Sequence, residues 1–131
     1  METIRTLLVD DNPEFLEAAK RFLSSETQLK IIGTADSGQE AIDKTEILDP
    51  DLILMDLAMP DMSGLEATQF IKQRSNPPHI VILTLHNTLE YREASQDVGA
   101  DGFITKSDFG NQLIPLIHFL FEGIGNTVPA S

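Results

Sequence analysis

Four apolar runs along the chain each stop at a polar or charged residue. Residues 7–9 precede Asp10 and Asp11, residues 52–55 precede Asp56, residues 80–83 precede Thr84, and residues 102–105 precede Lys106. Such runs are typical of parallel strands with both faces covered. The carboxyl ends of parallel strands meet at one edge, where open α/β sheets bind ligands. The pattern therefore predicts a pocket lined by three carboxylates, a hydroxyl and an ammonium group.

Helical patterns alternate with strand-like runs from end to end, which is typical of an α/β protein. The expected strands are residues 4–10, 29–35, 51–56 and 79–84, with a fifth beginning at 102. The expected helices are residues 13–24, 37–50, 64–74, 89–98 and 111–122. Five such units predict a doubly wound five-stranded parallel sheet, because right-handed crossovers place helices on both faces.

Two of the helices carry recognisable start signals. Asn12 is a good N-cap before Pro13, and Ser37 with Glu40 matches a capping box. The apolar face of residues 13–24 is predicted to be Phe15, Ala18, Ala19 and Phe22. Ala41, Ile47 and Leu48 are expected to face inward from residues 37–50.

The helix at 111–122 is unusually apolar. Its expected inward stripe is Leu113, Leu116, Ile117 and Leu120, which Ile114, Phe119 and Phe121 widen beyond one face. Pro115 is expected to kink or shorten this helix. Two interpretations of Phe119 and Phe121 stay open: they fold over the edge of the core, or they form a dimer or partner surface. Residues 123–131 show no pattern and are expected to form a flexible tail or the start of a linker, which leaves residues 1–122 as one domain.

The composition disfavours several classes of function. A length of 131 residues fits one domain with a substantial core. The net charge of −12 disfavours direct binding to nucleic acid or an anionic membrane. There is no cysteine, no signal peptide pattern and no apolar stretch approaching the roughly 20 residues that span a bilayer. A cytoplasmic location is the expectation.

The carboxylates of Asp10, Asp11 and Asp56 are expected to lie within a few ångströms of one another. Like charges at that separation repel, so at least one pKa rises unless a cation intervenes. A hard divalent cation such as Mg²⁺ prefers oxygen ligands of this kind. The sequence offers no cluster of His or Cys that suits Zn²⁺.

Phosphoryl transfer is the chemistry that this residue set favours. Asp56 is central and suited to act as a nucleophile that forms an aspartyl phosphate. Lys106 can pair with Asp56 or with phosphoryl oxygens, and the Thr84 hydroxyl can donate a hydrogen bond to one of them. Taken singly, each residue has an ordinary structural explanation, such as a cap, a strand residue or a surface charge. Only the joint pattern is specific.

The chain resembles the receiver domain of bacterial two-component response regulators over about residues 4–122. The residues that carry the resemblance are Val9-Asp10-Asp11, Met55-Asp56-Leu57-Ala58-Met59-Pro60, Gly64, Thr84 and Phe103-Ile104-Thr105-Lys106. The resemblance implies a flavodoxin-like sheet of order 2-1-3-4-5. It implies a site for Mg²⁺ or Mn²⁺ formed by Asp11, Asp56 and the Ala58 carbonyl, with Asp10 acting mainly through water. Thr84 and Lys106 are implied to hold the phosphoryl oxygens, and Thr84 and Phe103 to form the conformational switch.

The same resemblance implies a signalling role. Asp56 is expected to accept a phosphoryl group from a phosphohistidine of a sensor histidine kinase or phosphotransfer protein. The chain is then expected to catalyse only its own phosphorylation and autodephosphorylation and no other reaction. The surface of residues 89–98, 102–105 and 111–122 is expected to carry the output or a homodimer contact. A C-terminal output domain, of a DNA-binding type, is a further expectation.

Three positions depart from the commonest family pattern. Leu85 replaces a small residue after Thr84, and its bulk is expected to crowd the site or slow water entry. Ser107 stands where proline is frequent, so the geometry of the Lys106–Ser107 peptide bond stays open. Phe103 lacks the hydroxyl of the more usual tyrosine.

Three other functions are considered. A magnesium-dependent phosphatase with an aspartate nucleophile commonly has a second acid two residues later, where this chain has Ala58. A nucleotide- or flavin-binding domain is disfavoured because the sequence has no glycine-rich phosphate loop. A protein-interaction module without phosphorylation is weakened by the complete acceptor set.

Overall fold

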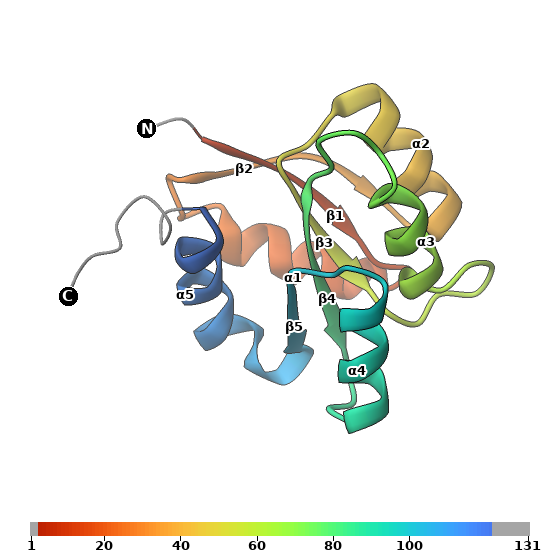
Figure 1. Cartoon of the computed structure of the whole chain (residues 1–131). Coiled ribbons are helices and arrows are strands. Elements are labelled where there is room, and N and C mark those ends of the chain that lie inside the picture. The colour runs from red at the N-terminus through yellow and green to blue at the C-terminus, as the bar shows by residue number, and fades with distance from the viewer. Residues whose placement is uncertain (1–2, 122–131) are drawn as a thin grey trace.

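The computed structural model describes residues 3–121. Five parallel strands form one sheet, in the order β2-β1-β3-β4-β5 (Figure 1). They are β1 (Ile4–Val9), β2 (Leu29–Ala35), β3 (Leu52–Asp56), β4 (His79–Thr84) and β5 (Gly102–Thr105). The doubly wound fold predicted from the sequence pattern and the strand order implied by the family resemblance are both confirmed.

Five α-helices cover the two faces of this sheet. They are α1 (Pro13–Leu23), α2 (Gly38–Leu48), α3 (Gly64–Ile71), α4 (Leu89–Asp97) and α5 (Phe109–Phe121), with a 3₁₀ turn at Lys106–Asp108 before α5. In Figure 1, α1 and α5 lie on one side of the sheet and α2 and α3 on the other. In the part of the chain described here, no helix has the length and apolar character needed to cross a membrane.

The core divides into two clusters because successive strand residues point to opposite faces. Leu8, Leu54 and Leu83 belong to the cluster under α1 and α5. Leu7 and Ile53 belong to the cluster under α2 and α3. The strands β3 and β4 and the end of β1 are therefore buried on both faces, which explains their uninterrupted apolar runs, whereas the edge strand β2 is only partly buried.

The caps predicted at Asn12 and Ser37 are confirmed except at Glu40, and α5 begins at Phe109, two residues before its predicted start at 111. The Asn12 side chain accepts hydrogen bonds from the backbone at the start of α1, and the Ser37 hydroxyl accepts one from the Glu40 N–H. The Glu40 carboxylate, however, accepts the N–H of Asp36, 2.8 Å away, so the capping box predicted at Ser37 is incomplete. A complete box begins α3 instead, between Ser63 and Glu66.

The predicted inward faces are wrong at two positions. Ile47 is 78% exposed, and Ile42 is buried in its place beside Ala41. Helix α2 presents to the sheet the face that contains Ile42 and Thr45, and Ile47 lies about 200° around the axis from Thr45. In α1, Ala18 is exposed because it lies about 100° around the axis from the buried Ala19.

Helix α5 runs through Pro115 to Phe121, so the expected shortening is wrong. Proline removes one hydrogen bond to the residue four positions earlier, and the remaining helical bonds continue on either side. Phe121 folds over the edge of the core, with its ring centroid 4.8 Å from that of His79. Phe119 is 69% exposed and does not. The tail predicted at 123–131 lies outside the described residues.

Candidate functional site

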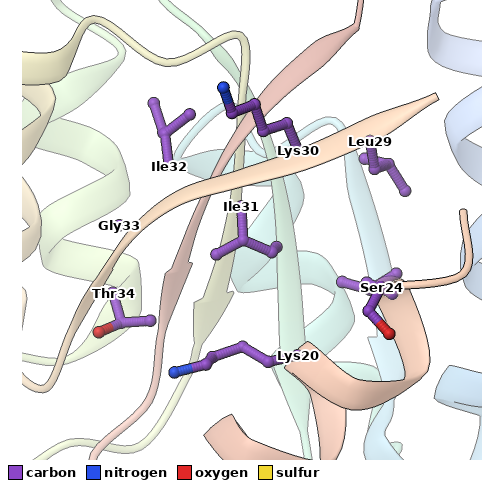
Figure 2. A pocket seen from close by; sticks show the side chains of 9 residues that line it. Lys20, Ser24, Leu29, Lys30, Ile31, Ile32, Gly33 and Thr34 are labelled. Atoms are coloured by element: carbon purple, nitrogen blue, oxygen red, sulfur yellow. The ribbon is translucent and has the colours of Figure 1, made fainter. Parts of the chain in front are cut away.

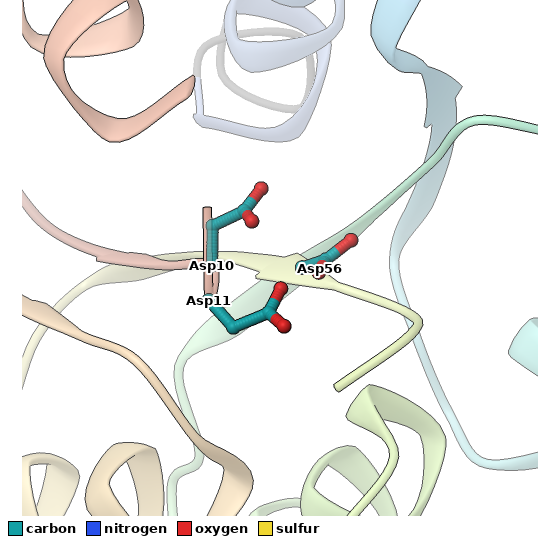
Figure 3. A group of neighbouring side chains, drawn as sticks. All are labelled: Asp10, Asp11 and Asp56. Carbon is teal, nitrogen blue, oxygen red and sulfur yellow. The ribbon is translucent and has the colours of Figure 1, made fainter. Parts of the chain in front are cut away.

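The ends of β1 and β3 bring three carboxylates together. Val9 pairs with Met55 in the parallel register, so Asp10 and Asp56 are level at the same edge of the sheet. Carboxylate oxygens of Asp10, Asp11 and Asp56 lie within 4.8 Å of one another (Figure 3). The convergence predicted from the sequence is confirmed.

These carboxylates differ in their access to water. Asp10 is fully buried, Asp56 is 4% exposed, and Asp11 is exposed. Burial, reinforced by the negative charge of Asp10, raises the pKa of Asp56 to about 6, although the nearby Lys106 acts in the opposite direction. Ionisation of the Asp56 carboxyl therefore costs more free energy in the folded protein than in the unfolded chain.

Lys106, which follows β5, supplies a positive charge beside these carboxylates. Its Nζ atom lies 2.5 Å from Asp10 Oδ2 and 3.2 Å from Asp56 Oδ1, and its side chain is only 12% exposed. The second oxygen of Asp10 accepts the Asn12 N–H at 2.8 Å. The sequence indicated that Lys106 reaches Asp56 but did not indicate that Asp10 is its nearer partner.

A cavity of about 210 Å³ opens beside Asp56. Its lining includes every residue that was predicted to hold the cation or the phosphoryl group. The lining residues are Asp10, Asp11, Asn12, Asp56, Leu57, Ala58, Thr84, Leu85, His86, Tyr91 and Lys106. Leu85 lines this cavity but is 74% exposed, so most of its surface faces solvent rather than the carboxylates.

Thr84 is the last residue of β4 and is 4% exposed. Its Oγ1 atom accepts the His86 N–H at 3.2 Å, a bond within the loop that follows the strand. A hydroxyl that accepts one hydrogen bond still has its own proton to donate. Thr84 can therefore donate to a group bound at Asp56 while remaining attached to the β4–α4 loop.

Gly64 holds the loop that contains Ala58 against the end of β3. The Gly64 N–H donates to the Leu57 carbonyl at 2.8 Å, and an added Cβ at residue 64 would come within 2.0 Å of the Asp56 carbonyl oxygen. Only glycine permits this approach. The loop from Leu57 to Ser63 is thus fixed at the mouth of the cavity.

Phe103, the expected switch aromatic, lies outside this cavity. It is half-buried on β5 and lines a separate cavity of about 250 Å³ together with residues of α4. The guanidinium carbon of Arg92 lies 4.6 Å from the centroid of its ring. The Lys106–Ser107 peptide bond is trans, since no peptide bond between described residues is cis.

Other features of the molecule do not join the site. His79 contacts Asp101 at the opposite edge of the sheet, and His118 contacts Gln28. A cavity of about 540 Å³ lies between α1 and the edge strand β2 (Figure 2). Its lining has ammonium groups from Lys20 and Lys30 but no carboxylate or imidazole, so it lacks the residue types predicted for the phosphoryl acceptor and the metal site.

The donor set fits a hard divalent cation. The three carboxylates can supply oxygen ligands from one small region, and their mutual repulsion is relieved by a positive ion. Lys106 carries a single positive charge against three negative ones. The site is therefore compatible with Mg²⁺ or Mn²⁺, the ions expected from the sequence.

Comparison with known proteins agrees with this geometry. The response regulator receiver domain family matches residues 6–118. The nitrate/nitrite response regulator protein NarL of Escherichia coli (strain K12) is 34% identical over 117 residues, which are 89% of this chain and 54% of that protein. The transcriptional regulatory protein YdfI of Bacillus subtilis (strain 168) is 40% identical over 119 residues, 91% of this chain and 55% of that protein. The chain spans about half the length of these curated relatives.

Solved structures show the same fold. A two-component response regulator of the LuxR family from Aurantimonas sp. SI85-9A1 has a TM-score of 0.87 and 29% identity, covering 99% of this chain and 90% of that chain. The response regulator domain of Thermotoga maritima CheB has a TM-score of 0.80 and 27% identity, covering 98% of this chain and all of that chain. The family match, these likenesses and the acidic pocket lead to one conclusion: the chain belongs to the receiver domain family of two-component response regulators.

Proposed function

We propose that this domain is a phosphorylation-activated switch with Asp56 as the phosphoryl acceptor. The observation that carries the proposal is the position of Asp56, nearly buried beside Asp10 and Lys106 at the wall of a cavity that opens to solvent. An Asp56 oxygen attacks the phosphorus of a phosphohistidine on a sensor kinase or phosphotransfer protein. The P–N bond of the donor breaks, the imidazole leaves, and an acyl phosphate forms on Asp56.

Residues around Asp56 would hold both the cation and the incoming group. Asp11, Asp56 and the Ala58 carbonyl are the proposed ligands of Mg²⁺ or Mn²⁺, and Asp10 would act mainly through water. The bound ion would neutralise charge on the transferring phosphoryl group. Lys106 and Thr84 would each donate a hydrogen bond to phosphoryl oxygens, so they interact more strongly with the phosphorylated state.

Output would follow from a shift in population between two conformations. The phosphoryl oxygens favour the conformation in which Thr84 and Lys106 reach them, and Phe103 occupies the space that Thr84 vacates. A coupling of this type is typically worth about 1–3 kcal/mol. The domain would act on no external substrate and catalyse only its own phosphorylation and dephosphorylation.

The output surface is proposed to be α4, β5 and α5. Leu89 on α4 and Phe119 on α5 are each more than two-thirds exposed, which supports a homodimer or partner contact there. Gel filtration with and without a phosphoryl analogue tests the dimer, and a monomer in both states at high concentration contradicts it.

Relatives named transcriptional regulatory proteins are about twice the length of the matched region. We infer that this domain controls a DNA-binding output domain.

Labelling with acetyl phosphate tests the central proposal. Intact mass measured with and without Mg²⁺ should show one added phosphoryl group only when the ion is present. Asp56→Asn should take up none, whereas the exposed Asp97→Asn on α4 should label like the parent protein. Normal labelling of Asp56→Asn contradicts the assignment of the acceptor.

A further inference from the structure

The aromatic ring of Phe15 lies against the ammonium group of Lys106. The Nζ atom is 4.5 Å from the ring centroid, inside the distance at which a cation is attracted to an aromatic face. The same atom lies 2.5 Å from Asp10 and 3.2 Å from Asp56. Lys106 is therefore held by two carboxylates and one ring, from three different elements of the fold.

A ring holds a cation differently from a carboxylate. It attracts the charge without occupying an N–H donor, and an ammonium group has three of them. In the described structure Asp10 accepts a hydrogen bond from Lys106, and Asp56 forms an ion pair with the same ammonium group. The contact with Phe15 thus leaves one donor for a phosphoryl oxygen while still restraining the long, flexible side chain.

Phe15 is itself fixed by a group of aromatic rings between α1 and α5. Its centroid lies 5.5 Å from that of Phe109 in an edge-to-face arrangement, and Phe22 packs on Phe109 at 5.7 Å. Phe109 is buried, and Phe15 and Phe22 are both half-buried. Phe15 and Phe22 therefore make similar contributions to the core, but Phe15 also contacts Lys106.

We propose that Phe15 is a positioning residue of the acceptor site, whose ring holds the Lys106 ammonium group where it can reach a phosphoryl group on Asp56. This inference rests on the proposed function of Asp56. The residue is recognisable only in the structure, because 91 positions of the sequence separate it from Lys106. Its effect acts through Lys106 and not through contact with the reacting atoms.

The experiment compares Phe15→Leu with Phe22→Leu, which loses the same atoms from the same aromatic group. Acetyl phosphate labelling of Phe15→Leu should be slower by about three- to tenfold, the range expected for loss of a partly desolvated cation–π contact. Phe22→Leu should stay within about twofold of the parent, with a similar fall in Tm. Phe15→Tyr, which keeps the ring, should restore the parent rate. Equal slowing in the two leucine variants overturns the proposal.

A double-mutant cycle separates positioning from packing. In a Lys106→Met background, Phe15→Leu should cause no further slowing, because the group that it positions is gone. An undiminished effect of Phe15→Leu in that background overturns the proposal. The residual labelling of Lys106→Met must remain measurable, which long incubations at high acetyl phosphate concentration provide.

NMR gives a readout that needs no phosphorylation. In ¹³C-lysine-labelled protein, the Lys106 ε-methylene protons should be shifted upfield by the ring of Phe15. This shift should be lost in Phe15→Leu and kept in Phe22→Leu. If the parent protein shows the shift but Asp56 takes no label, the proposed function fails while the contact stands. If no shift is present, the positioning role fails whether or not Asp56 is phosphorylated.

Discussion

The guanidinium group of Arg92 on α4 lies over the ring of Phe103 on β5, with 4.6 Å between Cζ and the ring centroid. The Arg92 Nη2 atom also donates to the Asn87 side chain at 2.7 Å. Asn87 belongs to the loop that follows Thr84. A single side chain thus joins the loop at the acceptor site to the proposed switch aromatic, which lacks a hydroxyl of its own.

This contact predicts an energetic coupling between Arg92 and Phe103. A double-mutant cycle with Arg92→Leu and Phe103→Leu, measured by urea unfolding, should give about 0.5–1 kcal/mol, the value expected at an exposed site. Asn87→Ala should reduce the coupling because it frees the guanidinium group. A coupling of zero within error would show that the contact does not restrain Phe103.

Asp56→Asn is expected to stabilise the metal-free domain at neutral pH. Burial and the charge of Asp10 raise the pKa of Asp56 to about 6 in the folded protein, against about 4 when unfolded. Such a carboxyl favours folding below pH 4 and loses that contribution as the pH rises through 6. The variant should gain about 1–3 kcal/mol at pH 7.5 with a chelator present. Urea unfolding should show this gain shrinking as the pH falls toward 4, and a constant gain would contradict the shift.

Magnesium should stabilise the parent domain and not the variant that lacks a ligand. An ion that binds only the folded state adds about 2.7 kcal/mol at a hundred times its Kd. Thermal unfolding in increasing MgCl₂ should therefore raise the Tm of the parent and of Asp97→Asn. The same titration should have little effect on Asp11→Asn. An equal rise in all three proteins would place the ion elsewhere.

The sequence predicted the fold well because the sheet is buried on both faces. Four of the five strands then contain an apolar run, and the residue that follows or ends each run lies at the same edge of the sheet. The same logic predicts that Asp10, Asp56 and Lys106 lie close together, because each stands at the carboxyl end of a parallel strand. Ala58 needed the family resemblance, because a backbone carbonyl leaves no mark on residue type.

The failures have physical causes of their own. Helix α2 has few large apolar residues, so its pattern did not distinguish Ile42 from Ile47 as the buried one. Lys106 is closer to Asp10 than to Asp56 because of the rotamer that its long side chain adopts in the folded protein. Asp10 and Lys106 are 96 residues apart in the sequence, so no local pattern reveals this contact. The contact with Phe15 depends on the packing of α1 against α5. Distances of this kind follow from tertiary packing and have no local sequence signal.

A network at the opposite edge of the sheet was also missed. Asp101 accepts hydrogen bonds from the Lys72 ammonium group at 2.7 Å and from the Ile80 N–H at 2.8 Å, and its carboxylate faces the His79 ring. Burial raises the pKa of Asp101, but the nearby His79 ring and the hydrogen bonds from Lys72 and the Ile80 backbone outweigh it and lower the pKa to about 2. The charged carboxylate therefore stabilises the folded state.

Asp101→Asn should destabilise the domain by about 2 kcal/mol at pH 7. A carboxyl with a lowered pKa contributes stability above its unfolded value, near 4, and loses it as the pH falls through 2. The difference between parent and variant in urea unfolding should therefore narrow across that range. Asp97→Asn serves as the control for loss of a negative charge. Equal effects of the two substitutions would assign the change to net charge and not to the network.

Gly64→Ala tests whether the close approach at the end of β3 shapes the acceptor site. The new Cβ would come within 2.0 Å of the Asp56 carbonyl oxygen, so the backbone of the β3–α3 loop has to move. We expect the free energy of unfolding to fall by about 2–4 kcal/mol, at the upper end for single substitutions. We also expect weaker Mg²⁺ binding, because the loop carries Ala58.

Gly110→Ala in α5 is the matched control, since its Cβ would meet nothing within 4 Å and alanine favours a helix by about 0.5–1 kcal/mol. The two variants should shift the urea midpoint in opposite directions. If Gly64→Ala folds with parent stability and binds Mg²⁺ normally, the loop does not depend on this contact.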